Sequence, residues 1–191
     1  MAKSFMVEIL ETEILSKFWS TVTKVTLKYT RGDGRSQILL REVHDHGAGA
    51  AVLAYDPLRK TVLLVKQMRI AAYMVGYTEA MIEVCAGLLD GDDPETCARR
   101  EAEEELGFQL HNLQFVCEAF ASPGAVTERV SLFVGNYAPA DKISHGGGVD
   151  AEGEDIEVIE LSLATAYRMI AMGVIVDAKT IILLQHAMML S

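Results

Sequence analysis

The sequence is poor in cysteine and lacks the patterns that a disulfide or zinc framework needs. Three cysteines occur in 191 residues, and an odd number argues against a full set of disulfides. Their spacing fits neither a zinc-binding pair nor a CxxC redox motif. We therefore expect Cys85, Cys97 and Cys117 to be small, buried hydrophobic side chains, and a reducing, cytoplasmic location for the protein.

Positive charge and long apolar runs are also scarce. Lys and Arg number 17 against 27 Asp and Glu, a net charge of -10, and phosphate backbones demand basic patches. The opening residues, MAKSFMVEIL, lack the charged and then apolar run of a signal peptide. The longest late apolar run, residues 181–190, contains Gln185 and His186 and is too short to span a bilayer. We expect neither a nucleic-acid nor a membrane partner, and a phosphate-bearing substrate would need cations to mediate its binding.

What the chain does contain is enough hydrophobic material for one domain with a small additional lobe. Residues 18–29 and 36–44 are rich in β-forming side chains and are separated by the turn Arg31–Gly34. Together with a short alternating segment at 5–13, they predict an N-terminal antiparallel β lobe over residues 1–46. Two or three strands are marginal alone, so the lobe must pack on the main domain, on a second subunit, or on both.

The remaining residues, 47–191, are predicted to form the main domain. Strands are expected at residues 50–56, 61–69, 81–84, 113–121, 130–137 and 155–161, and helices at 94–106, after Ser162 and after Asp177. The long polar segment 138–154 contains three consecutive glycines beside several acids. Such a loop is either a lid that closes over substrate or a flexible connector.

The most distinctive stretch is residues 86–108, AGLLDGDDPETCARREAEEELGF. The acidic pair before Pro94 predicts a helix start, and Gly107 predicts its end. On that helix, glutamates at positions 101, 104 and 105 share one face, whereas Glu103 points toward solvent. Like charges at this spacing repel, so a cation is expected to offset them. Mg2+ suits the position, because it takes oxygen ligands and leaves room for phosphate and water.

Three basic residues could serve the same site. Arg100 lies four residues before Glu104 and either neutralises part of the cluster or forms an ordinary helix ion pair. Arg69 lies two residues after Gln67, so in a strand both would share one face, which is either an exposed strand end or a ligand-facing surface. Lys179 is predicted in the first turn of the last helix, where the dipole disfavours a cation, and this favours contact with a phosphate or sugar.

The pattern Arg100-Glu101-Ala102-x-Glu104-Glu105-x-Gly107-Phe108, preceded by Gly87, resembles the signature box of the Nudix hydrolases. The stretch from Gly87 to Arg100 is one residue shorter than the general box, so the family's first, isolated glutamate has no unique match. Four further segments resemble the subgroup that hydrolyses nucleoside diphosphate sugars: residues 67–69, 122–128, the glycine-rich acidic loop 146–158, and 177–180. Within that subgroup the chain is most similar to the GDP-mannose pyrophosphatases, with the ADP-ribose pyrophosphatases close behind.

This resemblance implies an α/β fold, namely an α/β/α sandwich on a mixed sheet with a small N-terminal antiparallel β lobe. It also implies a homodimer in which the N-terminal lobes cross to the partner. The implied activity is hydrolysis of GDP-mannose to GMP and mannose 1-phosphate with Mg2+, for which Mn2+ is a possible substitute. The alternatives are hydrolysis of ADP-ribose to AMP and ribose 5-phosphate, and a non-catalytic nucleotide-sugar sensor. Sensors of this kind generally lose box glutamates, and this chain retains all three.

The resemblance also implies roles for individual residues. The metal ligands would be Glu101, Glu104, Glu105, Glu154 and the backbone carbonyl of Ala86. The catalytic base would be Glu104 or a loop acid, for which Glu154 competes with Glu152. Substrate contacts would come from Trp19, Arg41, Glu42, Arg69, Glu128 and Lys179.

Overall fold

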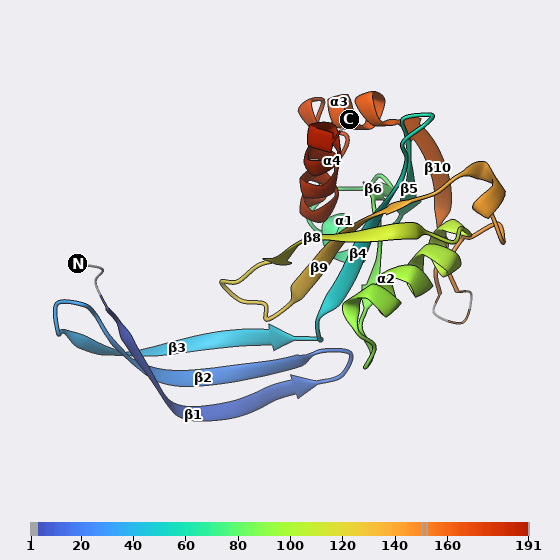
Figure 1. The fold of residues 1–191 in the computed structure, drawn as a ribbon. Helices are drawn as coiled ribbons and strands as arrows, with labels where there is room; N and C mark the ends of the chain where they lie inside the picture. The colour runs from blue at the N-terminus through green and yellow to red at the C-terminus, as the bar shows by residue number, and fades with distance from the viewer. Residues whose placement is uncertain (1–3, 150, 152, 191) are drawn as a thin grey trace. The chain divides into compact units, whose positions relative to one another are not determined.

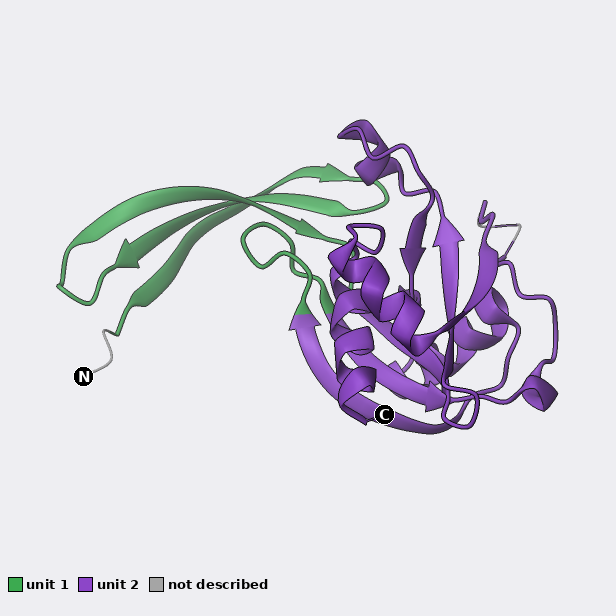
Figure 2. Cartoon of the chain, turned by 90° about the horizontal axis from the view of Figure 1, so that it is seen from above, with its two compact units in different colours: residues 1–48, 120–129 green, residues 49–119, 130–191 purple. Residues whose placement is uncertain are grey.

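A computed structural model describes residues 4–149, 151 and 153–190. The chain divides into two compact units, coloured separately in Figure 2 and described here one at a time. Unit 1 consists of the described part of residues 1–48 together with 120–129. Unit 2 consists of the described part of residues 49–119 and 130–191.

Unit 1 is built on a three-stranded antiparallel sheet of β1 (Met6–Lys17), β2 (Thr21–Thr30) and β3 (Ser36–Asp45), in that order (Figure 1). The first strand is twice interrupted in its pairing with β2, and its 12 residues extend well beyond the short segment predicted at 5–13. Gly34 adopts a φ of 86° in the turn between β2 and β3, and its amide donates to Arg31 O at 2.9 Å. The predicted turn is therefore present.

The second segment of unit 1 lies beside the end of β3. The His44 amide donates to Ala125 O at 2.8 Å, and the Thr127 amide donates to His44 O at 2.9 Å. The Thr127 hydroxyl also donates to Asp45 Oδ1 at 2.7 Å. These bonds hold the predicted 122–128 loop against β3.

Unit 2 contains a mixed sheet with the strand order β10-β5-β4-β9-β8, to which β6 adds beside β5 and β7 beside β4. β4 pairs in parallel with β9 and antiparallel with β5 and β7. The strand bounds are β4 (Gly49–Asp56), β5 (Thr61–Gln67), β6 (Met81–Glu83), β7 (Cys85–Leu88), β8 (His111–Phe120), β9 (Arg129–Asn136) and β10 (Glu157–Ser162).

Helices cover both faces of this sheet. Alternate residues of β4 enter two separate cores, Ala51, Leu53 and Tyr55 on one face and Ala50, Val52 and Ala54 on the other, as the two-residue strand period requires. The first core contains residues of α3 (Leu163–Ala171) and α4 (Ala178–Leu190), and the second those of α2 (Pro94–Glu101). The short α1 (Ile70–Met74) and a 3-10 turn (Pro139–Asp141) complete the elements. The expected α/β sandwich on a mixed sheet is confirmed.

Several local predictions are also confirmed. Asp93 caps α2, and Pro94 occupies its first turn. Ser162 caps α3, whereas the Thr180 amide at the start of α4 donates to Asp177 Oδ2 at 2.9 Å. Among the described residues, no helix is long and apolar enough to cross a membrane.

One local prediction was incomplete and two were wrong. The helix expected at 94–106 is present over those residues, but it is α-helical to Glu101 and a π turn over Ala102–Leu106. β5 ends at Gln67, and Arg69 precedes α1, so strand alternation does not place these two side chains on one face. Cys117 is only partly buried, although Cys85 and Cys97 are buried as expected, and all three are free.

Candidate metal and phosphate site

The helix that carries the box glutamates, α2 with its π turn (residues 94–106), is called the box helix below. Its buried side chains Cys97, Ala98, Ala102 and Leu106 fix one side of it to the sheet. Gly107, with a φ of 77°, ends the π turn, and its amide donates to Ala102 O. Packing and termination therefore determine which glutamates turn inward. Single π turns of this kind are frequent at functional sites.

Glu105 is the most deeply buried acid of the box helix, with 1% of its surface exposed. Its Oε2 accepts a hydrogen bond from the Ala86 amide at 3.1 Å. The resemblance implied that the Ala86 carbonyl is a metal ligand. In the structure, the amide of the same residue is hydrogen-bonded to Glu105. Burial raises the pKa of Glu105 to about 8, and the charges of Glu101 and Glu154 add to that rise, whereas Arg69 opposes it.

Glu101 is also buried, and its carboxylate lies directly against the backbone of Gly87. A Cβ at Gly87 would stand 2.0 Å from Glu101 Oε1, so any other residue there would force the Glu101 carboxylate to move. Burial raises the pKa of Glu101 to about 7, with repulsion from Glu104 and Glu154 adding to it. Arg100 opposes the rise, because its Nη1 lies 2.7 Å from Glu101 Oε1.

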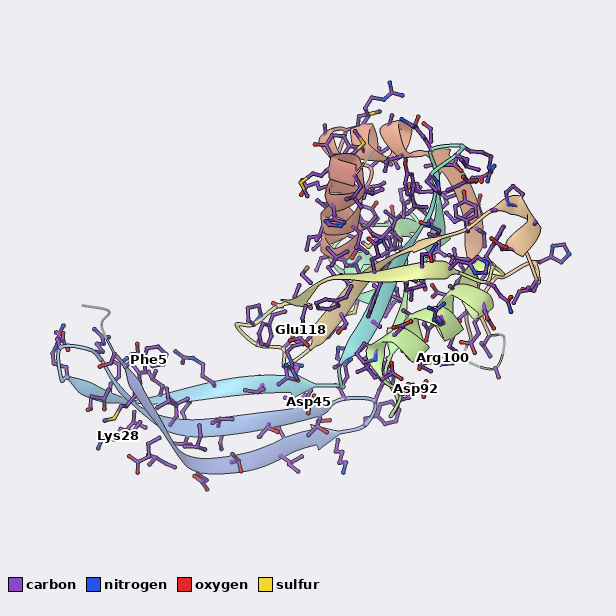
Figure 3. The ribbon with its side chains drawn as sticks, viewed as in Figure 1. Phe5, Lys28, Asp45, Asp92, Arg100 and Glu118 are labelled. Atoms are coloured by element: carbon purple, nitrogen blue, oxygen red, sulfur yellow. The ribbon has the colours of Figure 1, made fainter. Side chains whose placement is uncertain are left out.

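Arg100 is shared among several acids of this region. Besides Glu101, it contacts Glu104 at 3.2 Å. It also contacts Asp92 at 3.3 Å, and Figure 3 labels both residues of this pair. Glu104 is half-exposed, and Glu103 is exposed as predicted. Arg100 therefore neutralises part of the cluster, which is the first of the two interpretations drawn from the sequence.

The glycine-rich loop is hydrogen-bonded to the end of the box helix. The Gly147 amide donates to Glu105 O at 2.9 Å, and the Gly148 amide donates to Glu104 O at 3.1 Å. Glu154 in turn accepts from the Val149 amide at 2.9 Å. Residues 146–148 are thus attached to the box helix, which neither sequence interpretation anticipated. The competing acid Glu152 lies outside the described residues.

Glu101, Glu104, Glu105 and Glu154 form what we call the carboxylate cluster. Among the described residues, no three Asp, Glu, His or Cys side chains are already gathered around one metal position. Glu101 is turned to Arg100 and Glu105 to the Ala86 amide. The donor set nevertheless fits a hard divalent cation, because it offers carboxylate oxygens and two buried acids whose charge is incompletely offset.

A further buried acid, Glu83, lies at the end of β6 and was missed by the sequence analysis. It is 1% exposed and accepts from Arg69 Nε at 2.7 Å and Nη2 at 3.2 Å. Lys179 also donates to it. Glu83 therefore joins the two cations that were predicted to bind phosphate. The available signal was a single carboxylate inside the short apolar segment MIEVC, since a buried charge requires a partner.

Asp177 completes this group, which we call the Glu83 network (Glu83, Arg69, Lys179 and Asp177). It accepts from Lys179 Nζ at 2.8 Å and from the Thr180 hydroxyl at 2.5 Å. The Thr180 hydroxyl also accepts from the Val84 amide at 2.8 Å, which ties α4 to the chain beside β6. Burial alone would lower the pKa of Lys179, but Glu83 and Asp177 raise it above its usual value, so the ammonium stays charged.

The other predicted substrate contacts lie in unit 1. Trp19 stacks on His46 with 5.1 Å between ring centroids, and His46 Nε2 lies 3.7 Å from Glu128 Oε2. His46, which the sequence analysis did not select, therefore brings Trp19 and Glu128 into one group. Arg41 and Glu42 are exposed neighbours on β3 and point to opposite faces of that strand.

Comparison with known proteins identifies related sequences along nearly the whole chain. Residues 45–184 match the model of the NUDIX domain, and residues 6–44 match that of the GDP-mannose pyrophosphatase NudK N-terminal domain. A GDP-mannose pyrophosphatase of Cronobacter sakazakii is 45% identical over 184 residues, covering 96% of this chain and 95% of that protein. Proteins of the same name from Klebsiella pneumoniae and Yersinia pestis are 44% and 45% identical and cover 96% of this chain and 92% of their own length.

The family match covers most of the chain and includes the box helix, the glycine-rich loop and the Glu83 network. The chain therefore belongs to the Nudix family and is a Nudix hydrolase.

Proposed function

We propose that this enzyme hydrolyses GDP-mannose to GMP and mannose 1-phosphate, with Mg2+ as its metal and Mn2+ as a possible substitute. The observation that carries the proposal is the similarity to GDP-mannose pyrophosphatases along 96% of the chain, including the N-terminal segment as well as the Nudix domain. The box motif by itself does not distinguish among nucleoside diphosphate sugars.

The reaction adds one water across the diphosphate bridge. The water oxygen bonds to one phosphorus, the bridging P–O bond breaks, and two monophosphates leave. A bound Mg2+ would neutralise the phosphates and lower the pKa of a coordinated water. Glu101, Glu104, Glu105 and Glu154, with the Ala86 carbonyl, would hold it. Arg100 contacts Glu101 through Oε1, so Oε2 of the same carboxylate would remain for the metal.

The proton of the attacking water needs an acceptor. Glu104 and Glu154 are our candidates for this base. Glu104 is the more accessible of the box glutamates to solvent, and Glu154 is held by the Val149 amide beside the box helix. Arg69 and Lys179 would bind substrate phosphate, for which Glu83 already holds both cations in place.

Unit 1 would contribute residues that select the substrate and a surface that binds a second subunit. We assign residues 1–46 to a lobe for dimerisation and nucleotide contacts, and residues 47–191 to the catalytic domain. Trp19, Arg41, Glu42 and Glu128 would contact the nucleotide or sugar. Every described position of β1 is exposed, including Ile9 and Ile14, and an uncovered three-stranded sheet needs another surface to stabilise it.

The proposed homodimer is tested by light scattering at micromolar concentration. We expect twice the mass of the chain for the wild type and a shift toward the monomer for Ile14→Lys, with Lys28→Ala on β2 as the control. A monomeric wild type would contradict the dimer. The three free cysteines suit a reducing compartment, so we place the reaction in the cytoplasm.

The substrate is tested by incubating the enzyme with Mg2+ and either GDP-mannose or ADP-ribose, and resolving the products by 31P NMR. We expect GMP and mannose 1-phosphate to form at a higher kcat/KM than AMP and ribose 5-phosphate. The reverse order would make ADP-ribose the substrate. Calorimetric binding of either compound without product, with any divalent ion, would instead identify a sensor.

A further inference from the structure

A pocket of about 570 Å³ opens on unit 2 among residues that have no role in the carboxylate cluster or the Glu83 network. Its apolar lining comes from Leu63, Phe108, Pro139, Ile156 and Val158. Polar side chains and two glycines complete it: Arg59, Lys142, His145, Glu160, Gly146 and Gly147. This volume and this mixture of an apolar surface with a few polar groups are typical of small-molecule sites.

The basic side chains of the pocket differ in how they are engaged. Arg59 is committed to acids, because its Nε donates to Asp56 Oδ2 at 2.7 Å and it also pairs with Glu160. Lys142 and His145 form no ion pair with any residue that the structure describes, and both are exposed. Lys142 Nζ lies 5.8 Å from the centre of the Phe108 ring. An ammonium group and an imidazole N–H are therefore available beside an aromatic surface.

Glu160 Oε1 accepts from the Tyr137 hydroxyl at 2.6 Å and pairs with Arg59. Because Arg59 also pairs with Asp56, these three groups together carry one net negative charge, and Lys142 supplies the positive charge that an anionic ligand would meet. The available groups are then cationic or hydrogen-bond donors on an otherwise acidic protein. An anionic group on a ligand would pair with Lys142, and an apolar body would cover Phe108 and Val158.

The pocket is also connected to the box helix. Gly147 lines it, and the Gly147 amide donates to Glu105 O at 2.9 Å. Gly146 lines it as well, and a Cβ there would stand 2.4 Å from Glu105 O. A ligand in the pocket would therefore touch the segment that holds the end of the box helix.

From this lining we propose that the pocket is a second binding site, which takes a small molecule in which an apolar ring carries an anionic group. Benzyl phosphate is a suitable probe, and benzyl alcohol is its uncharged counterpart. Calorimetry should show that benzyl phosphate binds the wild type more tightly than benzyl alcohol does. Lys142→Ala should weaken the binding of benzyl phosphate about two- to fivefold, as loss of one exposed ion pair implies, whereas the control Lys28→Ala should leave that binding unchanged.

A second variant and a second readout locate the site. Val158→Trp fills the apolar lining and should abolish binding of both probes. Hydrogen exchange of the wild type should slow over residues 143–148 when benzyl phosphate is present. Equal affinity in wild type, Lys142→Ala and Val158→Trp would overturn the proposal, and so would protection confined to residues 69–88, since the probe would then occupy the Glu83 network.

Discussion

Unit 2 buries two glutamates to the same extent and surrounds them differently. Glu83 and Glu105 are each 1% exposed. Glu83 accepts a bidentate pair of bonds from Arg69 and a further bond from Lys179. Glu105 receives one backbone hydrogen bond and faces other acids, and Arg69 offsets only part of the rise in its pKa.

This difference separates two uses of a buried acid. A carboxylate with two cationic partners is balanced within the fold, so its role is to hold those partners in place. A carboxylate beside other carboxylates is not compensated within the fold, so its pKa rises and the metal-free protein holds it protonated until a cation takes the place of the proton. We therefore read Glu83 as a positioning residue and Glu105 as a metal ligand.

The strongest test of the comparison removes the charge of Glu105. Glu105→Gln should lower kcat for GDP-mannose by roughly 100- to 1000-fold in saturating Mg2+. The reason is that the metal which stabilises the charge of the transition state would lose one of its carboxylate ligands. The same variant should be no less stable than wild type in EDTA, since it removes an uncompensated charge. Wild-type turnover by folded, Mg2+-saturated Glu105→Gln would contradict the proposed role. Glu103→Gln, exposed on the same helix, is the matched control.

Removing the charge of Glu83 should lower stability more, and kcat less, than removing the charge of Glu105. Glu83→Gln leaves Arg69 and Lys179 without their shared acid and should cost about 2–4 kcal/mol of unfolding free energy. This is less than for a fully buried pair, because Arg69 is half-exposed and water screens its charge. Urea unfolding in EDTA measures it. KM for GDP-mannose should rise more than kcat falls, because the acid acts through the phosphate-binding cations. An unchanged KM would show that Glu83 is structural only.

Metal-free stability should depend on pH through the carboxylate cluster. The pKa values of Glu101 and Glu105 rise from 4.5 to about 7 and about 8, so the folded state binds their protons more tightly than the unfolded chain does. Their contribution is complete below about pH 4.5 and is lost as pH rises through 7 and 8. In EDTA, the melting temperature should fall by several degrees from pH 5.5 to 8.5, and Mg2+ should restore it most at pH 8.5.

The matched control for that pH dependence is the Glu101→Gln, Glu105→Gln double variant. Its melting temperature in EDTA should change less between pH 5.5 and 8.5 than that of the wild type. Mg2+ should raise the melting temperature of this variant little at either pH. The same fall in wild type and double variant would place the titrating groups elsewhere.

The sequence predicted those parts of the site that depend on local pattern. The cap at Asp93, the stop at Gly107 and the outward direction of Glu103 follow from spacing and turn chemistry, and all three are present. Glu83 and His46 were missed because their importance comes from partners far along the chain: Lys179 is 96 residues from Glu83, and Glu128 lies well beyond His46. Spacing along one element cannot show such pairs.

Other features depended on packing between segments. The π turn arises where the box helix meets the loop, and the Gly147 amide reaches Glu105 O only after both have folded. The face assigned to Arg69 failed because β5 stops two residues earlier. A propensity-based reading extends a strand or a helix until a breaker residue, whereas the packed structure ends it where a partner strand or loop ends.

The smallest expected effect concerns an acid that is compensated but not buried. Glu95 pairs with Arg99 at 2.7 Å on the exposed side of α2. Like Glu83, it has an arginine partner, but unlike Glu83 it is exposed to solvent. Glu95→Gln should cost about 0.5 kcal/mol or less and leave kcat and KM unchanged, because water screens an exposed pair. Urea unfolding in low and high salt measures it, and the difference from wild type should shrink in high salt. A loss as large as that of Glu83→Gln would show that pairing alone, without burial, sets the cost, and the comparison between the two glutamates would fail.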